Sequence, residues 1–193
     1  RGSRRGQYFS HGHRFYRRAI SGFGFLTLKP TVVLINTGEG AVPEWDHLVD
    51  IVSEIWPYPN TAVAAISVQI EGEADQLEPH DRQEFLETYG ITGGAVGRVS
   101  RAVYDATSTA VAYTWNASQV QAWPFPTGAT AVDFAEMIHS DIARGFISAE
   151  TISYDDLVAA GSIAEARRHG IVRKEGRDYA VMDGDIVQVL FSR

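Results

Sequence analysis

The chain has 193 residues, of which 45% are hydrophobic and 21% charged. This length allows one large or two small domains with a hydrophobic core, and the composition excludes a disordered or fibrous protein. The absence of cysteine excludes disulfides and thiolate metal sites. No apolar run reaches the roughly 18 residues that cross a bilayer. The sequence therefore predicts a cytoplasmic protein that does not enter a membrane.

The formal net charge of −7 is distributed unevenly along the chain. Residues 1–38 contain seven basic and no acidic residues, so all 24 acidic side chains lie in the rest of the chain. We interpret residues 1–21 as a basic helical arm or a disordered N-terminus, because Gly2, Gly6 and Gly12 interrupt a regular helix. A basic arm suits a contact with RNA phosphates, and a solvated arm without a ligand is the alternative.

Two apolar, β-branched segments are predicted as buried parallel strands. Residues 31–36 form one such run, which ends in Asn36, and residues 61–68 form the other. Apolar residues at helical spacing predict a helix over 43–56, which Pro57 ends. This order predicts a strand–helix–strand unit in which a ligand binds at the carboxyl ends of the strands.

Further helices are predicted over residues 81–90 and 98–104. The polar break at 107–109 marks a domain boundary. We therefore expect an α/β domain over residues 22–107 and a second domain over residues 108–193.

The second domain is predicted as a compact α+β module. Two strands precede a long amphipathic helix that includes Val132 and stops at Gly145. An extended apolar run begins at Phe146, and after a short helical patch a hydrophobic strand over 186–191 closes the chain. This order is typical of a ubiquitin-like β-grasp, in which a small mixed sheet wraps over one helix.

A family resemblance runs through this last third of the chain. The segments that carry it are residues 120–123, 128–131, 138–141, 145–147, 175–179 and 183–185. From Trp123 onward the region resembles, without a gap, the C-terminal TGS domain of the YchF family of Obg-related, GTPase-like ATPases associated with translation. That family usually has Phe at the position of Ile142 and Arg at that of Ser148. The resemblance implies a β-grasp (TGS) fold.

Residues 22–36 and 98–104 resemble the rear part of the YchF nucleotide domain. Asn36 and Glu39 match the family's Asn-x-x-Glu, which replaces the guanine-binding Asn-Lys-x-Asp of P-loop GTPases. The resemblance implies that these two residues contact a base and that ATP is accepted. Taken without the resemblance, Asn36 to Glu39 fit a turn from a strand into a helix.

The resemblance also implies a second base-contacting loop after the second strand. It assigns to this loop Ser67, Val68 and Gln69. Where the family has small alanines, this chain has the larger Val68 and Gln69, which leave less space for a base.

The chain has no segment of the form G-x-x-x-x-G-K followed by Ser or Thr. In such a segment backbone amides and the lysine bind phosphates, and the hydroxyl binds Mg²⁺. We therefore predict no catalytic residue, no metal site and no hydrolysis of ATP or GTP by this chain alone. The first domain is interpreted as a partial P-loop-type domain, from a longer protein or a degenerate relative. ATP or GTP with Mg would bind once the missing N-terminal half is supplied.

Three functions remain as alternatives. The preferred one is a ribosome- or translation-factor-binding module, with Trp123, His139, Asp141 and Arg144 as candidate partner-binding residues. A second is an adenine-nucleotide-binding regulatory domain that needs a separate P-loop half. A third is a small-ligand-sensing TGS module, like those of threonyl-tRNA synthetase and stringent-response enzymes. Because neighbours on one helix point about 100° apart, residues 139–141 are predicted to cap a helix end rather than form a catalytic relay.

Overall fold

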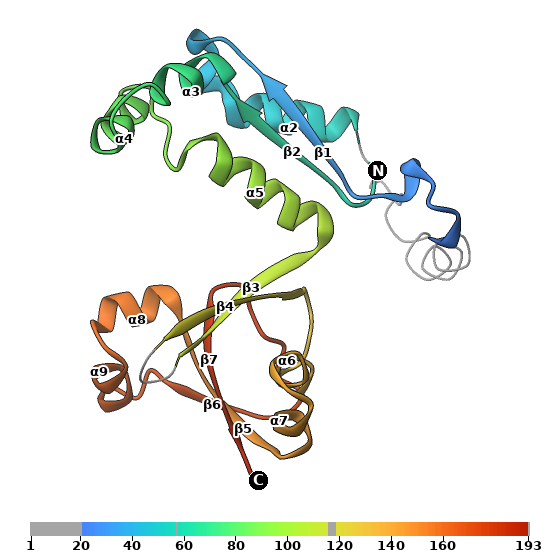
Figure 1. Ribbon diagram of the computed structural model, residues 1–193, viewed down its shortest axis with the longest axis vertical. Coiled ribbons are helices and arrows are strands. Elements are labelled where there is room, and N and C mark those ends of the chain that lie inside the picture. The colour runs from blue at the N-terminus through green and yellow to red at the C-terminus, as the bar shows by residue number, and fades with distance from the viewer. Residues whose placement is uncertain (1–20, 57, 116–118, 193) are drawn as a thin grey trace, which may run out of the picture. The chain divides into compact units, whose positions relative to one another are not determined.

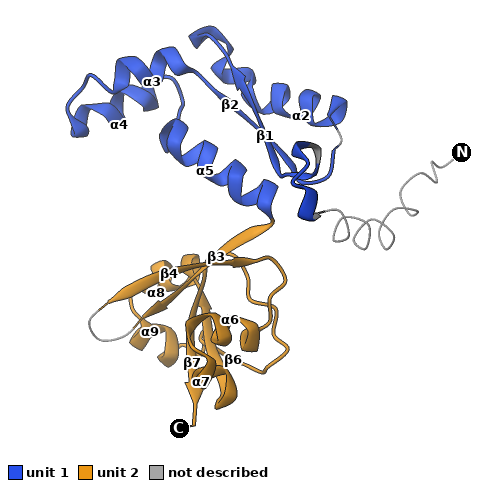
Figure 2. Cartoon of the chain, turned by 45° about the vertical axis from the view of Figure 1, so that its right-hand side comes forward, with its two compact units in different colours: residues 1–107 blue, residues 108–193 orange. Residues whose placement is uncertain are grey.

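The computed structural model describes residues 21–56, 58–115 and 119–192. The predicted basic arm over residues 1–21, with its RNA contact, lies outside the described residues except for Ser21. The chain divides into two compact units; unit 1 ends at Thr107 and unit 2 begins at Ser108 (Figure 2). Within the described ranges, no helix combines the length and the apolar character that a membrane crossing needs.

Unit 1 contains a sheet of two parallel strands, β1 (Thr31–Asn36) and β2 (Thr61–Ile66) (Figure 1). The predicted first strand is confirmed, whereas the second ends at Ile66, two residues early, because Ser67 caps a helix. The helices are α2 (Trp45–Ile55), α3 (Val68–Ala74), α4 (Pro79–Thr88), α5 (Gly94–Thr107) and the 3-10 helices η1 (Ser21–Phe23), η2 (Leu26–Leu28) and η3 (Glu39–Glu44).

The core of unit 1 forms around the first residue of α2. Trp45 is 4% exposed and belongs to a buried cluster with Ala65, Ile70, Leu86 and Ile91. These side chains come from α2, β2, α3, α4 and the residues that follow α4. The buried indole therefore fixes the start of α2 against the end of the sheet.

Unit 2 contains a five-stranded mixed sheet with the strand order β4-β3-β7-β5-β6. Strands β3 and β7 are parallel, and the other neighbouring pairs are antiparallel. The strands are β3 (Thr109–Trp115), β4 (Val120–Pro126), β5 (Phe146–Ser153), β6 (Arg173–Glu175) and β7 (Asp185–Phe191), and the helices are α6 (Ala131–Ile138), α7 (Ser140–Arg144), α8 (Tyr154–Ala160) and α9 (Ile163–Arg168).

Helices cover both faces of this sheet, α6 and α7 on one side and α8 and α9 on the other (Figure 1). The larger core lies under α6 and α7, where Phe125 and Phe134 are almost fully buried and their rings meet edge to face at 5.7 Å. A smaller cluster under α8 and α9 contains Ile152, Ala166 and Ile186. The sheet is thus the middle of three layers.

The prediction of one long helix is wrong, because His139 separates two helices, α6 and α7, in the structure. His139 has extended backbone angles (φ −169°), and its side chain accepts a hydrogen bond from the Asp141 N–H, so it caps α7. The predicted capping role is therefore confirmed for His139, whereas Ser140 and Asp141 lie in the first turn of α7. Gly145 ends α7 as predicted, and a Cβ at this position would collide with the carbonyl oxygen of Ser192. The sequence also missed the short strand β6 and the division of the helical patch into α8 and α9.

Candidate functional site

The two predicted base-contacting segments meet at the carboxyl ends of β1 and β2. Asn36 is the last residue of β1 and lies opposite Ile66 of β2. Its side-chain Oδ1 accepts a hydrogen bond from the Val68 N–H at 3.1 Å, and the Thr37 N–H donates to the Ile66 carbonyl at 2.9 Å. The side chain of Asn36 therefore links the first segment to the second.

The second segment is the start of a helix and not the predicted loop. Ser67 is fully buried, and its hydroxyl accepts the Ile70 N–H at 3.4 Å as the N-cap of α3. Val68 is 58% exposed, and the exposed Gln69 side chain donates to Glu73 at 3.1 Å. Ser67 thus serves the helix, and the surface here is formed by Val68 and Gln69.

The first segment turns from β1 into η3, with the exposed Glu39 as the first residue of that 3-10 helix. The indole N–H of Trp45 donates to the Thr37 hydroxyl at 2.7 Å. The Arg98 guanidinium of α5 lies over the Trp45 ring, 4.7 Å from its centroid. The buried Trp45 indole therefore fixes this turn through its hydrogen bond to Thr37, and the cation–π contact with Arg98 holds the indole in place. Sequence reasoning included Arg98 only as a member of a matched helix and missed its contact with Trp45.

A carboxylate of α3 fixes the beginning of α5. Glu71 accepts a hydrogen bond from the Ala95 N–H in the first turn of that helix. The same carboxylate forms an ion pair with Arg82 of α4 at 3.4 Å. A negative charge is favourable at a helix N-terminus, since the peptide dipoles and free N–H groups point toward it. Both segments are thus linked to α5. The second is linked through Glu71, which follows it in α3, and the first through Trp45 and its contact with Arg98.

Three of the candidate partner-binding residues in unit 2 form one exposed polar corner between α6 and α7. His139 Nδ1 accepts the Asp141 N–H at 3.1 Å, and Asp141 forms an ion pair with Arg144. Each of the three side chains is more than half exposed. We call His139, Asp141 and Arg144 the α6–α7 corner.

The fourth candidate, Trp123, has a different environment. It lies within β4. Its side chain is only partly exposed and packs against the larger core of unit 2, and its indole N–H donates to Thr114 at 2.9 Å. Most of the ring is therefore engaged within unit 2.

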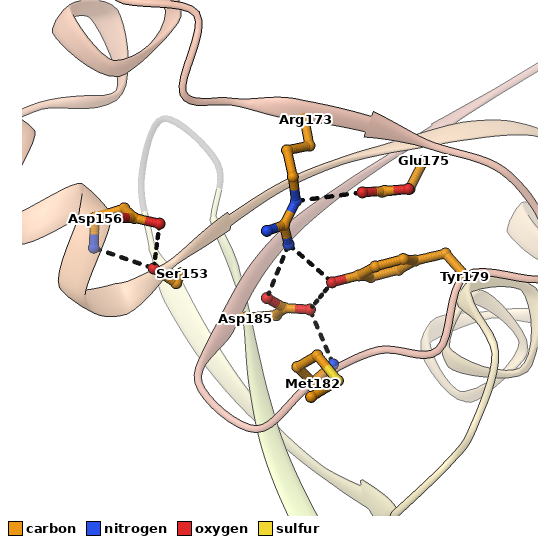
Figure 3. A network of polar contacts seen from close by, with 7 residues as sticks. All are labelled: Ser153, Asp156, Arg173, Glu175, Tyr179, Met182 and Asp185. Atoms are coloured by element: carbon orange, nitrogen blue, oxygen red, sulfur yellow. Dashed lines mark hydrogen bonds and ion pairs between the residues drawn. The ribbon is translucent and has the colours of Figure 1, made fainter.

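Sequence reasoning missed a buried polar network around Asp185 and included this residue only in a segment that carries the family resemblance. Asp185 is 2% exposed and accepts hydrogen bonds from the Tyr179 hydroxyl at 2.8 Å and the Met182 N–H at 2.9 Å (Figure 3). Arg173 lies 3.8 Å from the same carboxylate and donates to the Tyr179 hydroxyl at 2.9 Å. Burial, together with the hydrogen bond to Asp185 and its negative charge, raises the pKa of Tyr179.

Comparisons with known proteins found one family model and several similar sequences. The family model YchF-GTPase_C, described as a protein of unknown function (DUF933), matches residues 110–192. The Ribosome-binding ATPase YchF of Pasteurella multocida is 38% identical over 175 residues, which are 91% of this chain and 48% of that protein. The protein of the same name from Bacillus subtilis is 35% identical over 178 residues, 91% of this chain and 49% of that protein.

The chain is homologous to the C-terminal region of YchF proteins. It spans about half the length of the curated YchF relatives that it matches. The structure of the Schizosaccharomyces pombe YchF GTPase has a TM-score of 0.69, with 23% identity, and covers 97% of this chain and 49% of that chain. At this identity the likeness concerns the fold, a mixed α/β fold with a five-stranded sheet.

The family-model match distinguishes the two groups of candidate residues. Its range of 110–192 contains the α6–α7 corner, Trp123 and the Asp185 network. Asn36, Glu39 and residues 67–69 precede that range, in the part of the chain that only the matches to the YchF relatives cover.

Proposed function

We propose that this chain is a ribosome- or translation-factor-binding module and that unit 2 makes the contact. The observation that carries the proposal is the homology, over 91% of the chain, to proteins named ribosome-binding ATPases. Unit 2 is also the part that the family model matches almost completely. In this proposal the chain binds its partner without hydrolysing a nucleotide.

We propose further that unit 2 is a TGS domain with the β-grasp fold. The strand order supports this, because the first and last strands of the unit, β3 and β7, lie next to each other and parallel. The helix α6 follows the second strand and packs on one face of the sheet, as a grasped helix does. The likeness to the S. pombe YchF fold is consistent with this assignment.

The α6–α7 corner is the contact surface that the proposal assigns to unit 2. Its side chains are exposed yet already oriented by the cap on α7 and the Asp141–Arg144 ion pair. Such orientation lowers the conformational entropy that a partner has to remove on binding. Arg144 suits a phosphate or carboxylate on the partner, since its guanidinium offers several donors in one plane.

Cosedimentation with ribosomes at low salt tests this function, with full-length B. subtilis YchF as the positive control. We expect the chain to pellet with ribosomes and Arg144→Ala to weaken binding about fivefold, the loss of roughly 1 kcal/mol of polar contact. Arg168→Ala is the matched control, because Arg168 is similarly exposed and pairs with Glu165 three residues earlier. If full-length YchF pellets and this chain does not, the proposed function is wrong.

A second candidate function is adenine-nucleotide binding that depends on a separately supplied P-loop half. The hydrogen bond between Asn36 and Val68 favours it, because this bond joins the two candidate base-contacting segments at the carboxyl ends of β1 and β2. The proposed ligand is ATP, or GTP, with Mg²⁺, and the proposed contacts are Asn36, Glu39, Val68 and Gln69. Ser67 would act through the N-cap of α3.

Titration with Mg-ATP tests the second candidate when the N-terminal half of a YchF relative is added. We expect the amide signals of Asn36, Glu39 and Val68 to shift, and Glu39→Gln to reduce the apparent affinity. Signals that stay unmoved at millimolar Mg-ATP, with the added half shown to be folded, would exclude base binding at the carboxyl ends of β1 and β2.

A further inference from the structure

Unit 2 has a small cavity on the side of its sheet that carries α8. The cavity has a volume of about 290 Å³, which accommodates one long side chain and not a whole drug-sized ligand. It is lined by Tyr113, Ser153, Tyr154, Asp155, Asp183 and Gly184. We call it the Tyr154 cavity. None of its residues belongs to the α6–α7 corner or to the segments with Asn36 and Ser67.

Large apolar side chains are exposed on the segments that supply the lining of the Tyr154 cavity. Tyr154 and Val158 are 58% and 60% exposed and lie one turn apart on α8, so they share one face of that helix. Met182, which precedes the cavity residue Asp183, is 59% exposed. Neighbouring exposed apolar side chains of this kind mark surfaces that bind another molecule.

The charge at the Tyr154 cavity is negative. Asp155 and Asp183 both line it, and Asp156 follows in the first turn of α8. Within the described residues, the Asp155 side chain makes no hydrogen bond or ion pair. Asp183 is held in place because its Oδ1 accepts the Val111 N–H at 2.8 Å. Phenol rings attract a guanidinium or ammonium group through their ring faces, and carboxylates attract the same group through their negative charge.

Hydrogen bonds fix both walls of the Tyr154 cavity. On the side of α8, Asp156 and Ser153 form a reciprocal cap with contacts of 3.1 and 2.7 Å (Figure 3). On the other side, the Met182 N–H is bound by the buried Asp185. The Tyr154 N–H joins the two walls by donating to the Gly184 carbonyl at 3.0 Å. A ligand therefore meets a surface whose backbone is already ordered.

We propose that the Tyr154 cavity docks a basic, partly apolar segment of a protein partner. An arginine or lysine side chain enters the cavity against the tyrosine rings, with its charge toward Asp155 and Asp183. Apolar side chains of the same segment pack on Val158 and Met182. Nucleic acid does not suit this surface, because its phosphates would meet the carboxylates of Asp155 and Asp183. The inference rests on the proposed partner-binding function of unit 2 and deepens it by specifying a protein partner of positive charge.

The first test uses a defined probe and the whole chain. An acetylated, amidated hexapeptide of alternating leucine and arginine is titrated while amide signals are followed. The matched peptide with glutamate in place of arginine and an oligouridylate serve as comparison ligands. We expect the arginine peptide alone to shift Tyr113, Tyr154 and Gly184, and Asp155→Asn to weaken its binding about fivefold. Glu136→Gln, an exposed acid on α6 across the sheet, is the control and leaves binding unchanged. Equal shifts with the glutamate peptide, or shifts with oligouridylate alone, would overturn the proposal.

The second test separates this inference from the proposed function. Ribosome cosedimentation is repeated with Tyr154→Ala and with Asp155→Asn, both at exposed positions and both checked for an intact amide spectrum. We expect each variant to bind at least fivefold more weakly than the unchanged chain. If the unchanged chain and both variants pellet equally well, the cavity proposal is wrong while ribosome binding stands. If the unchanged chain does not pellet but binds the arginine peptide through Asp155, ribosome binding is wrong while the cavity proposal stands.

Discussion

The edge strands of the two units differ in how they are protected against pairing with a further strand. In unit 2 the edge strand β4 carries Pro124 and Pro126, which lack an N–H for pairing with a further strand. The opposite edge strand, β6, has three residues, and all of them are charged. Proline, charge and short length are the usual protections of a sheet edge. Unit 2 therefore has a complete sheet with a core on both faces.

Unit 1 lacks these protections along β1. This strand has six residues without charge or proline, and Leu34 in its middle is 45% exposed. Within the described residues, β1 pairs only with β2. Parallel sheets are ordinarily buried on both faces and contain more than two strands. Within the described residues, the sheet of unit 2 thus has protected edge strands, whereas β1 of unit 1 has an edge with none of these protections.

The largest test of this comparison is Phe134→Ala in the core of unit 2. The side chain is fully buried against Phe125, and its removal is expected to destabilise unit 2 by about 3–5 kcal/mol. Denaturant titration followed by amide signals from each unit measures the effect. Unit 1 signals should keep their midpoint while those of unit 2 move to lower denaturant. A common shift of both units would show that unit 2 does not fold independently.

A second, smaller effect is expected from Asp185→Ala. The variant leaves the Tyr179 hydroxyl and the Met182 N–H without their acceptor, which costs about 1–3 kcal/mol when such groups are buried. Asp185→Asn is the comparison variant, since it keeps one acceptor oxygen and should lose less. Unfolding of unit 2 by denaturant gives both values. Equal stability of the alanine variant and the unchanged chain would show that the network does not stabilise the sheet.

In unit 1 we expect Asn36→Ala to reduce local stability by about 1 kcal/mol, through loss of one hydrogen bond. Hydrogen exchange of the Val68 amide should accelerate about fivefold, because its acceptor is gone. Asn36→Asp retains that acceptor and should retain most of the protection. Unchanged exchange at Val68 in the alanine variant would mean that the two segments are not linked through Asn36.

Local patterns predicted much of the two folds. The apolar run 31–36 and the helical spacing after Pro43 correspond to β1 and α2, because burial on a sheet enforces those periods. The short helical patch predicted after Phe146 corresponds to α8 and α9, and Asp155 and Asp156 provide the acidic first turn of α8. Such signals need only residues that are close in sequence.

Three features of the structure could not be predicted from residue spacing. Arg98 over Trp45 spans more than fifty positions, and no spacing rule relates them. The burial of Asp185 depends on Tyr179 and Arg173 reaching it from outside β7. The break at His139 was missed because helix periodicity continues across it, while one histidine side chain caps the second helix. Tertiary packing therefore decided the first two features, and a local side-chain cap decided the third.

The smallest expected effect on stability, and the most direct test of the open edge, is Leu34→Lys. Because Leu34 is half exposed, the variant should change the free energy of unfolding by no more than about 0.5 kcal/mol. We expect the unchanged chain to self-associate through β1 at high concentration. Because a lysine on β1 opposes pairing with a further strand, sedimentation velocity should show severalfold weaker association of the variant. Ile147→Lys is the control, since Ile147 is 60% exposed on β5, which has neighbours on both sides. If both lysine variants reduce association equally, general surface charge and not the β1 edge is responsible, and the contrast between the two sheets loses its functional meaning.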